Sequence, residues 1–124
     1  MFGKILLPSS TRFGRKRKIV ELYEGKDTTL SIAPPNIVTL DRVYHLYEPL
    51  VCKVEKEDDY YVIQAPFLDL YAAGPTIDSA ELNFYTEFDL AYKRFNELND
   101  DQLSDRLLRA KKTINLLVKE ITKD

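Results

Sequence analysis

The sequence predicts an α+β fold, in which an antiparallel sheet is packed by two amphipathic helices near the C-terminus. Three observations support this class. Residues 50–65 alternate between apolar and polar side chains, which is typical of half-buried strands. Two later segments carry apolar residues at steps of three and four, which is typical of helices laid on a core. The composition, with 44% hydrophobic and 31% charged residues, is that of an ordinary folded domain.

The chain has 124 residues, about the length of one domain, and its charge is unevenly distributed. Residues 1–18 contain six Lys and Arg and no acid, which leaves 12 basic and 20 acidic residues, a net charge of −8, for 19–124. We therefore divide the chain into a basic N-terminal arm, 1–18, and a single α+β domain, 19–124. One cysteine permits no internal disulfide, and no apolar run is long enough for a signal peptide or a membrane span. We expect a cytoplasmic protein that does not enter the membrane.

An N-terminal hairpin is expected from two β-prone segments, 19–23 and 29–32, with turn residues between them. Pro34 and Pro35 end this hairpin because a proline cannot donate a ladder hydrogen bond. An isolated two-stranded hairpin is only marginally stable in water, so we expect this one to extend the main sheet.

The three-stranded core of that sheet is expected between residues 50 and 73. The first strand places Leu50, Cys52 and Val54 on one face, and a polar turn at 56–59 leads to a second alternating strand at 60–65. Pro66 breaks the ladder, so it marks a bend or bulge before a third short strand at 67–73.

Two helices follow. Gly74 ends the strands and Thr76 is the expected N-cap of the first helix, whose apolar stripe consists of Ile77, Ala80, Phe84, Phe88, Ala91, Phe95 and Leu98. The second helix is expected over 100–123, with Asn99 or Asp100 as its cap. Its apolar stripe consists of Leu103, Leu107, Ala110, Ile114, Leu117 and Ile121.

Few residues indicate catalysis. His45 is the only histidine and lies within a strand pattern, and Cys52 alternates with apolar residues, so a packed ring and a buried, inert thiol are the expected states. One histidine and one cysteine cannot build the usual zinc sites. Asp69 interrupts an apolar run and is the one acid with a candidate role, although an outward-facing strand residue is the favoured interpretation. We expect no enzyme activity, no cofactor and no metal.

The basic arm is the strongest electrostatic signal. Clustered Lys and Arg neutralise phosphates, so the arm is a candidate nucleic-acid contact. The alternative is a solvated basic segment ahead of an acidic domain. The candidate residues are Arg12, Arg15, Lys16, Arg17 and Lys18.

Over residues 50–95 a strand and a polar turn lead to Tyr61, Pro66 and Gly74, and the helix capped by Thr76 carries an early Ala80. This order of elements resembles the HicB-like antitoxin domain. In that family an aromatic-rich strand leads through a proline to a glycine and to a threonine-capped helix with an early alanine. The positions that carry the resemblance are Tyr61, Pro66, Gly74, Thr76 and Ala80. The resemblance implies a partial ribonuclease-H-like fold of three antiparallel strands and a packed helix. It also implies a protein that binds and blocks a small ribonuclease toxin.

Three functional hypotheses follow. The first is a non-enzymatic HicB-like inhibitor of a ribonuclease toxin, expected to be a homodimer because edge strands and the second helix offer self-complementary surface. The second is a nucleic-acid-binding or regulatory protein that uses the basic arm, or a stand-alone dimeric interaction module. The third is a vestigial ribonuclease-H-like enzyme that uses carboxylates and a divalent metal.

Overall fold

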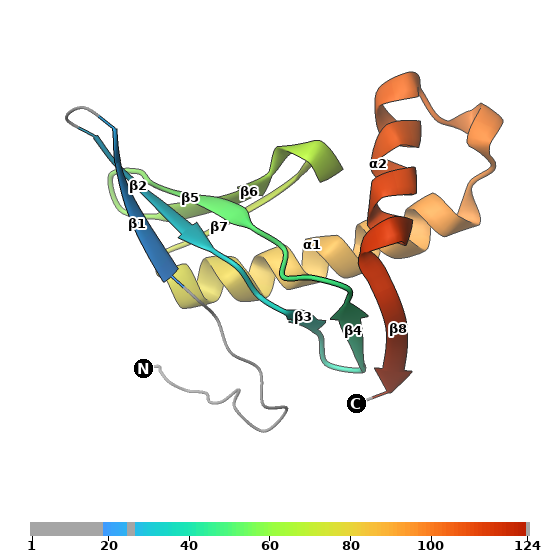
Figure 1. Ribbon diagram of the computed structural model, residues 1–124, viewed down its shortest axis with the longest axis horizontal. Helices are drawn as coiled ribbons and strands as arrows, with labels where there is room; N and C mark the ends of the chain where they lie inside the picture. Colours follow the sequence, from blue (N-terminus) through green and yellow to red (C-terminus); the bar gives the residue numbers. More distant parts are fainter. Residues whose placement is uncertain (1–18, 25–26, 124) are drawn as a thin grey trace.

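The computed structural model describes residues 19–24 and 27–123, with side chains from Leu30 onward. It confirms the α+β class, with two helices and antiparallel sheets (Figure 1). The helices are α1 (Ile77–Glu97) and α2 (Asp105–Leu117). Neither is long and apolar enough to span a membrane, and no other described helix is either.

The larger sheet has five antiparallel strands in the order β1-β2-β5-β6-β7. The N-terminal hairpin joins the sheet through β2, where Ile32 pairs with Cys52 of β5. Burial alternates along β5 and β6 as the sequence predicts, with Cys52, Val54, Ile63 and Ala65 on the covered face. The strands are β1 (Ile19–Glu24), β2 (Asp27–Ile32), β5 (Cys52–Lys56), β6 (Tyr61–Ala65) and β7 (Leu70–Gly74).

A second, smaller sheet was not expected from the sequence. It consists of β3 (Asn36–Val38), β4 (Arg42–Leu46) and β8 (Val118–Lys123), with β4 in the centre. The prediction of one helix over 100–123 is therefore wrong at its C-terminal end, because α2 stops at Leu117. Strand β8 includes β-branched Val118, Ile121 and Thr122, and pairing with β4 satisfies its backbone groups in an extended conformation.

The start of the second helix also differs from the prediction. Asn99 caps a short 3-10 turn, η3 (Asp100–Gln102), and α2 begins after Ser104. The Ser104 hydroxyl accepts a hydrogen bond from the backbone N–H of Leu107 at 3.3 Å. Serine is a favoured N-cap residue and starts a new helix at this point, so a 3-10 turn and a shorter helix replace one continuous helix.

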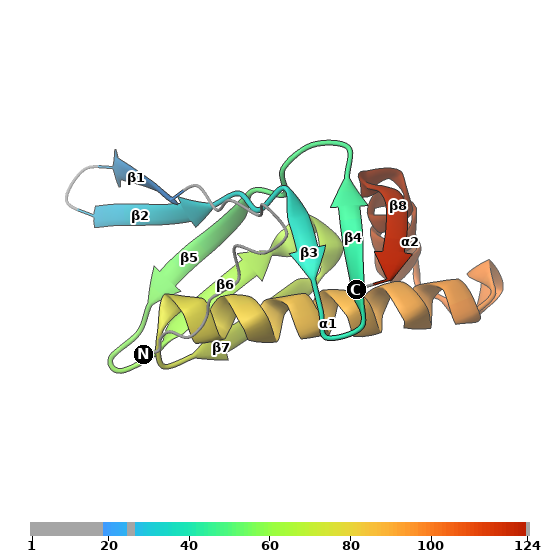
Figure 2. The same ribbon diagram turned by 90° about the horizontal axis from the view of Figure 1, so that it is seen from below.

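Helix α1 is the centre of the core (Figures 1 and 2). Its apolar stripe packs on the larger sheet, where Phe84, Phe88 and Phe95 are buried as predicted. The smaller sheet reaches another side of the helix. There the Tyr44 ring of β4 makes edge contacts with Phe88 and Tyr92, at centroid distances of 5.4 and 5.2 Å. Such pairs favour this geometry because ring edges are positive and ring faces negative.

The connection into α1 has the predicted cap. The Thr76 hydroxyl accepts from the N–H of Ser79 at 3.0 Å, and the Ser79 hydroxyl accepts from the N–H of Thr76 at 3.0 Å. This reciprocal pair is a capping box. Gly74 precedes it in a tight space, since a Cβ there would lie 2.4 Å from Ser79 Oγ and 2.6 Å from the Ala80 nitrogen.

Between β6 and β7 the chain makes a 3-10 turn rather than a simple bulge. This turn, η2 (Pro66–Leu68), starts at the proline that was expected to bend the chain. Asp69 closes it with a φ of 58° and is therefore not the strand residue that the apolar run suggested. Aspartate is one of the few residues that tolerate this left-handed conformation. Strand β7 consequently begins at Leu70, later than predicted.

Candidate functional site

Strand β7 is an edge strand of the larger sheet. It pairs with β6 on one side, and no described strand pairs with its other side. The Asn83 side-chain amide donates to the Ala73 carbonyl at 2.8 Å, so this carbonyl points away from β6. Backbone groups in a strand alternate with a period of two, and the N–H and C=O of Tyr71 therefore face the same open side. These two groups are available to another strand.

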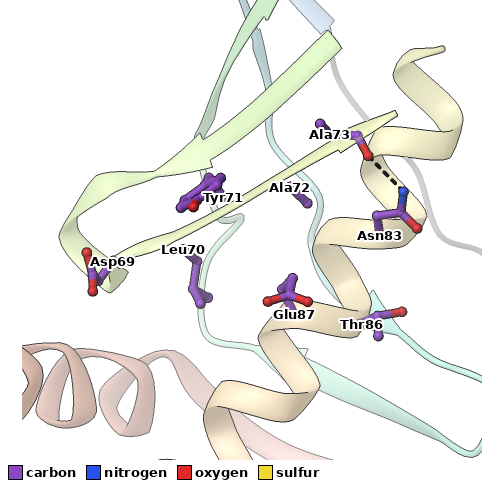
Figure 3. Close-up of a pocket in the computed structure, with 8 residues that line it drawn as sticks. All are labelled: Asp69, Leu70, Tyr71, Ala72, Ala73, Asn83, Thr86 and Glu87. Atoms are coloured by element: carbon purple, nitrogen blue, oxygen red, sulfur yellow. Dashed lines mark hydrogen bonds between the residues drawn. The ribbon is translucent and has the colours of Figure 1, made fainter. Parts of the chain in front are cut away.

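An open groove of about 400 Å³ lies beside this edge, between β7 and α1 (Figure 3). Leu70 and Ala72 form its apolar floor and are almost fully buried. Polar groups come from α1, where spacings of three and four place Asn83, Thr86 and Glu87 on one side of the helix. The groove therefore joins an apolar floor to a polar wall and an unpaired backbone. Its lining residues are Asp69, Leu70, Tyr71, Ala72, Ala73, Asn83, Thr86 and Glu87.

Two carboxylates give the groove a negative character. Asp69 stands at the start of β7 and Glu87 on α1, with Leu70 between them in Figure 3. Asp69 has a partial partner in Arg106 of α2, whose guanidinium lies 3.6 Å away. Both side chains of that pair are well exposed, so the pair contributes less than about 1 kcal/mol. Glu87 has no ion pair among the described residues and is exposed.

The face of the larger sheet opposite α1 is uncovered and mainly polar. Gln64 donates to the carboxylate of Glu55, and Lys53 lies 3.5 Å from the same carboxylate. Tyr71, next to Gln64 in the register, is 71% exposed on this face and lies beside the free edge. Because Gln64 and Lys53 already contact Glu55, this face offers fewer free groups to a partner than the β7 edge does.

A buried carboxylate links the small sheet to α1. Asp89 accepts hydrogen bonds from the hydroxyl of Tyr44 and, at 3.0 Å, from the ammonium of Lys93, and the Arg42 guanidinium lies 3.8 Å away. Burial, followed by the Asp89 carboxylate, raises the pKa of Tyr44 above its usual range. Two cations and one hydroxyl therefore surround this carboxylate, which holds β4 against the helix and offers no free group to a ligand.

The residues first considered for catalysis have separate structural contacts. Cys52 is fully buried, its thiol donates to the Leu50 carbonyl at 3.6 Å, and burial, followed by the nearby Glu81 carboxylate, raises its pKa to about 12. The reactive thiolate is therefore scarce at neutral pH. His45 lies in β4, and its Nε2 is 2.9 Å from the hydroxyl of Thr122. Neither side chain is a groove residue, whereas Asp69 is.

The basic residues proposed to contact nucleic acid lie outside the described residues. These are Arg12, Arg15, Lys16, Arg17 and Lys18. Within 19–24 and 27–123, no three His, Cys, Asp or Glu side chains are grouped as metal ligands would be. Of the groove residues, only Asp69 was a candidate from sequence. No local pattern indicates that Asn83 and Glu87 of one helix border the free edge of β7.

No protein-family model matches the chain, and no curated protein or solved structure matches it either. The β7 edge, the groove and their charges are therefore the features from which function is argued.

Proposed function

We propose that this chain is a non-enzymatic, HicB-like interaction protein that binds and inhibits a small ribonuclease toxin. The observation that carries the proposal is the free edge of β7 beside a groove with polar and apolar walls. An exposed edge strand offers main-chain hydrogen bonds to a partner, and an adjacent groove adds side-chain selectivity. Both features belong to the segment 50–95, on which the resemblance to HicB-like antitoxins rests.

Charge supports a ribonuclease as the partner. Residues 19–124 carry a net charge of −8, whereas a protein that binds RNA presents Lys and Arg to the phosphates. Opposite charges accelerate association and favour this partner over neutral or acidic proteins. An acidic inhibitor also competes directly with RNA for the same cationic surface, so inhibition needs no catalytic group on this chain.

Coexpression with the product of the adjacent reading frame tests the proposal. The expected neighbour encodes a small ribonuclease with a double-stranded-RNA-binding-like fold. We expect the two proteins to copurify, and light scattering after size exclusion to give the mass of a defined complex. The same measurement on this chain alone tests the expected homodimer, for which β8 is a second edge strand with exposed side chains. An adjacent ribonuclease that elutes separately at micromolar concentration would contradict the proposal.

Nucleic-acid binding through the basic arm is the second candidate function. The observation that favours it is the absence of any acid in residues 1–18 beside six Lys and Arg. We expect the wild-type chain to bind RNA or DNA with an affinity that falls steeply with salt. Replacing Arg15, Lys16, Arg17 and Lys18 with Ala should weaken binding and flatten the salt dependence by about four counterions. If affinity and slope do not change, the arm is not the contact.

A further inference from the structure

We propose that the β7 edge and its groove bind an extended, basic segment of the partner as an additional antiparallel strand of the larger sheet. This inference rests on the proposed function and specifies how the partner is held. Three features carry it: the unpaired backbone of Tyr71, the occupied carbonyl of Ala73 and the carboxylates of Asp69 and Glu87.

The backbone fixes where the added strand pairs. Asn83 already donates to the Ala73 carbonyl, so the acceptor that remains free on this side of β7 is the carbonyl of Tyr71. In an antiparallel ladder one residue exchanges two hydrogen bonds with the residue opposite. The residue of the bound segment that lies opposite Tyr71 therefore makes both bonds, and its side chain lies beside the Tyr71 ring on the uncovered face.

The neighbouring residue of the bound segment enters the groove. Successive side chains in a strand point to opposite faces, so the residue opposite Leu70 points toward α1, as Leu70 itself does. There it meets Asp69 on one side and Glu87 on the other (Figure 3). A Lys or Arg fits both surroundings, because its methylene groups cover Leu70 while its charge reaches the carboxylates. Arg106 already neutralises part of Asp69, so Glu87 is the stronger determinant.

The same charges disfavour a second copy of this chain as the occupant. Two β7 strands paired around Tyr71 would bring two Asp69 and two Glu87 side chains toward one interface. Like charges gathered at one interface repel each other, which disfavours this pairing. A basic segment instead gains from each carboxylate, and RNA-binding proteins are rich in such segments.

Peptide titration into the isotopically labelled full chain, followed by NMR, tests the inference. The probe is an acetylated and amidated seven-residue peptide in which Lys and Val alternate. We expect the backbone amides of Tyr71 and Ala73 to shift and the Tyr71 amide to exchange more slowly. A peptide with Glu in place of Lys should not bind. Equal binding of both peptides, or unchanged Tyr71 and Ala73 amides at millimolar probe, would overturn the inference.

Two matched pairs separate the backbone from the charge. With Val opposite Tyr71, methylating the Val amides blocks the ladder, whereas methylating the Lys amides leaves it intact. We expect about tenfold weaker binding for the first peptide and little change for the second. In the protein, Glu87→Gln should weaken binding by roughly two- to fivefold, whereas Glu97→Gln, the same change elsewhere on α1, should not. If both methylated peptides bind equally, the added-strand geometry is wrong. If both protein variants bind equally, Glu87 does not select a basic side chain and that part of the inference is wrong.

The outcomes distinguish this inference from the proposed function. If the ribonuclease is inhibited equally by wild type and Glu87→Gln, and the peptide does not shift Tyr71, the function stands and the inference fails. If the peptide binds as expected and no ribonuclease is inhibited, the inference stands and the function fails. If the Tyr71 amide shifts with protein concentration alone, the occupant is a second copy and the inference is wrong.

Discussion

At the scale of single residues, burial and a nearby carboxylate determine the pKa of the Cys52 thiol. Its thiol lies in the core between the larger sheet and α1, and Glu81 of that helix adds a nearby negative charge. Both effects disfavour the thiolate, the first more strongly. The same residue on an exposed loop would titrate near its usual pKa and react readily.

This environment predicts a pH dependence of stability. The pKa of Cys52 rises from 9.0 to about 12 on folding, so its neutral form is favoured in the folded state. The stability that Cys52 contributes is therefore complete below pH 9 and is lost as the pH rises toward 12, at up to about 1.4 kcal/mol per pH unit. The free energy of unfolding, measured with urea at pH 8, 9 and 10, should fall more for wild type than for Cys52→Ala. Parallel curves for the two proteins would show that Cys52 is not buried as described.

Residues also differ in what the sequence reveals about them. The burial of Phe84 and Phe88 follows from spacing alone, because the helix that carries them is a local structure. The role of Asp69 does not follow from spacing. Its left-handed φ depends on the 3-10 turn before it, and its place in the groove depends on how α1 packs beside β7. The sequence therefore indicates that Asp69 is unusual but does not predict its position in the groove.

At the scale of elements, the N-terminus of α1 is defined by capping side chains that the sequence predicts. Thr76 and Ser79 satisfy each other's backbone N–H groups, and Asp78 in the first turn suits the positive end of the helix dipole. The capping box therefore fixes Thr76 as the residue at which the connection from β7 ends and α1 begins. This matters for the groove, because the junction sets how α1 runs along the β7 edge.

We expect Thr76→Ala to lower the free energy of unfolding by about 1 kcal/mol, because it removes the oxygen that accepts from the Ser79 N–H. Thr86→Ala is the matched control. Among the described residues, the Thr86 hydroxyl bonds only to the carbonyl one turn earlier on α1, and alanine is the better helix former. Urea denaturation should show a loss for the first variant and no loss for the second. Equal stability of both variants would mean that the cap contributes nothing.

The segment after α2 shows where prediction from sequence fails. Leu117 and Ile121 continue a helical spacing, which predicts a second helix through residue 123. In the structure, Tyr44 pairs with Ile121 and Val43 with Thr122, and these bonds to β4 replace the last helical turns. The partner strand lies more than seventy residues earlier, so no window of local sequence contains this information. The small sheet was missed for the same reason.

At the scale of the whole molecule, charge and topology work together. All of the acidic residues lie in a domain whose larger sheet ends in a free strand, while six of the 18 basic residues precede this domain in the sequence. We propose that a cationic partner is attracted to the domain as a whole and held at the β7 edge in particular. Electrostatic attraction at this scale predicts that association with the ribonuclease slows as salt is raised, whereas dissociation depends mainly on contacts at the groove.

Cleavage of a labelled RNA by the neighbouring ribonuclease, titrated with this chain, tests the central claim most directly. We predict that cleavage falls in proportion to added protein and stops near equal molar amounts, because a bound inhibitor covers the cationic RNA site. Glu87→Lys should require an excess, since it reverses a charge in the groove, and Glu97→Lys should behave as wild type. Cleavage that continues unchanged with a tenfold excess of the wild-type chain would contradict the claim.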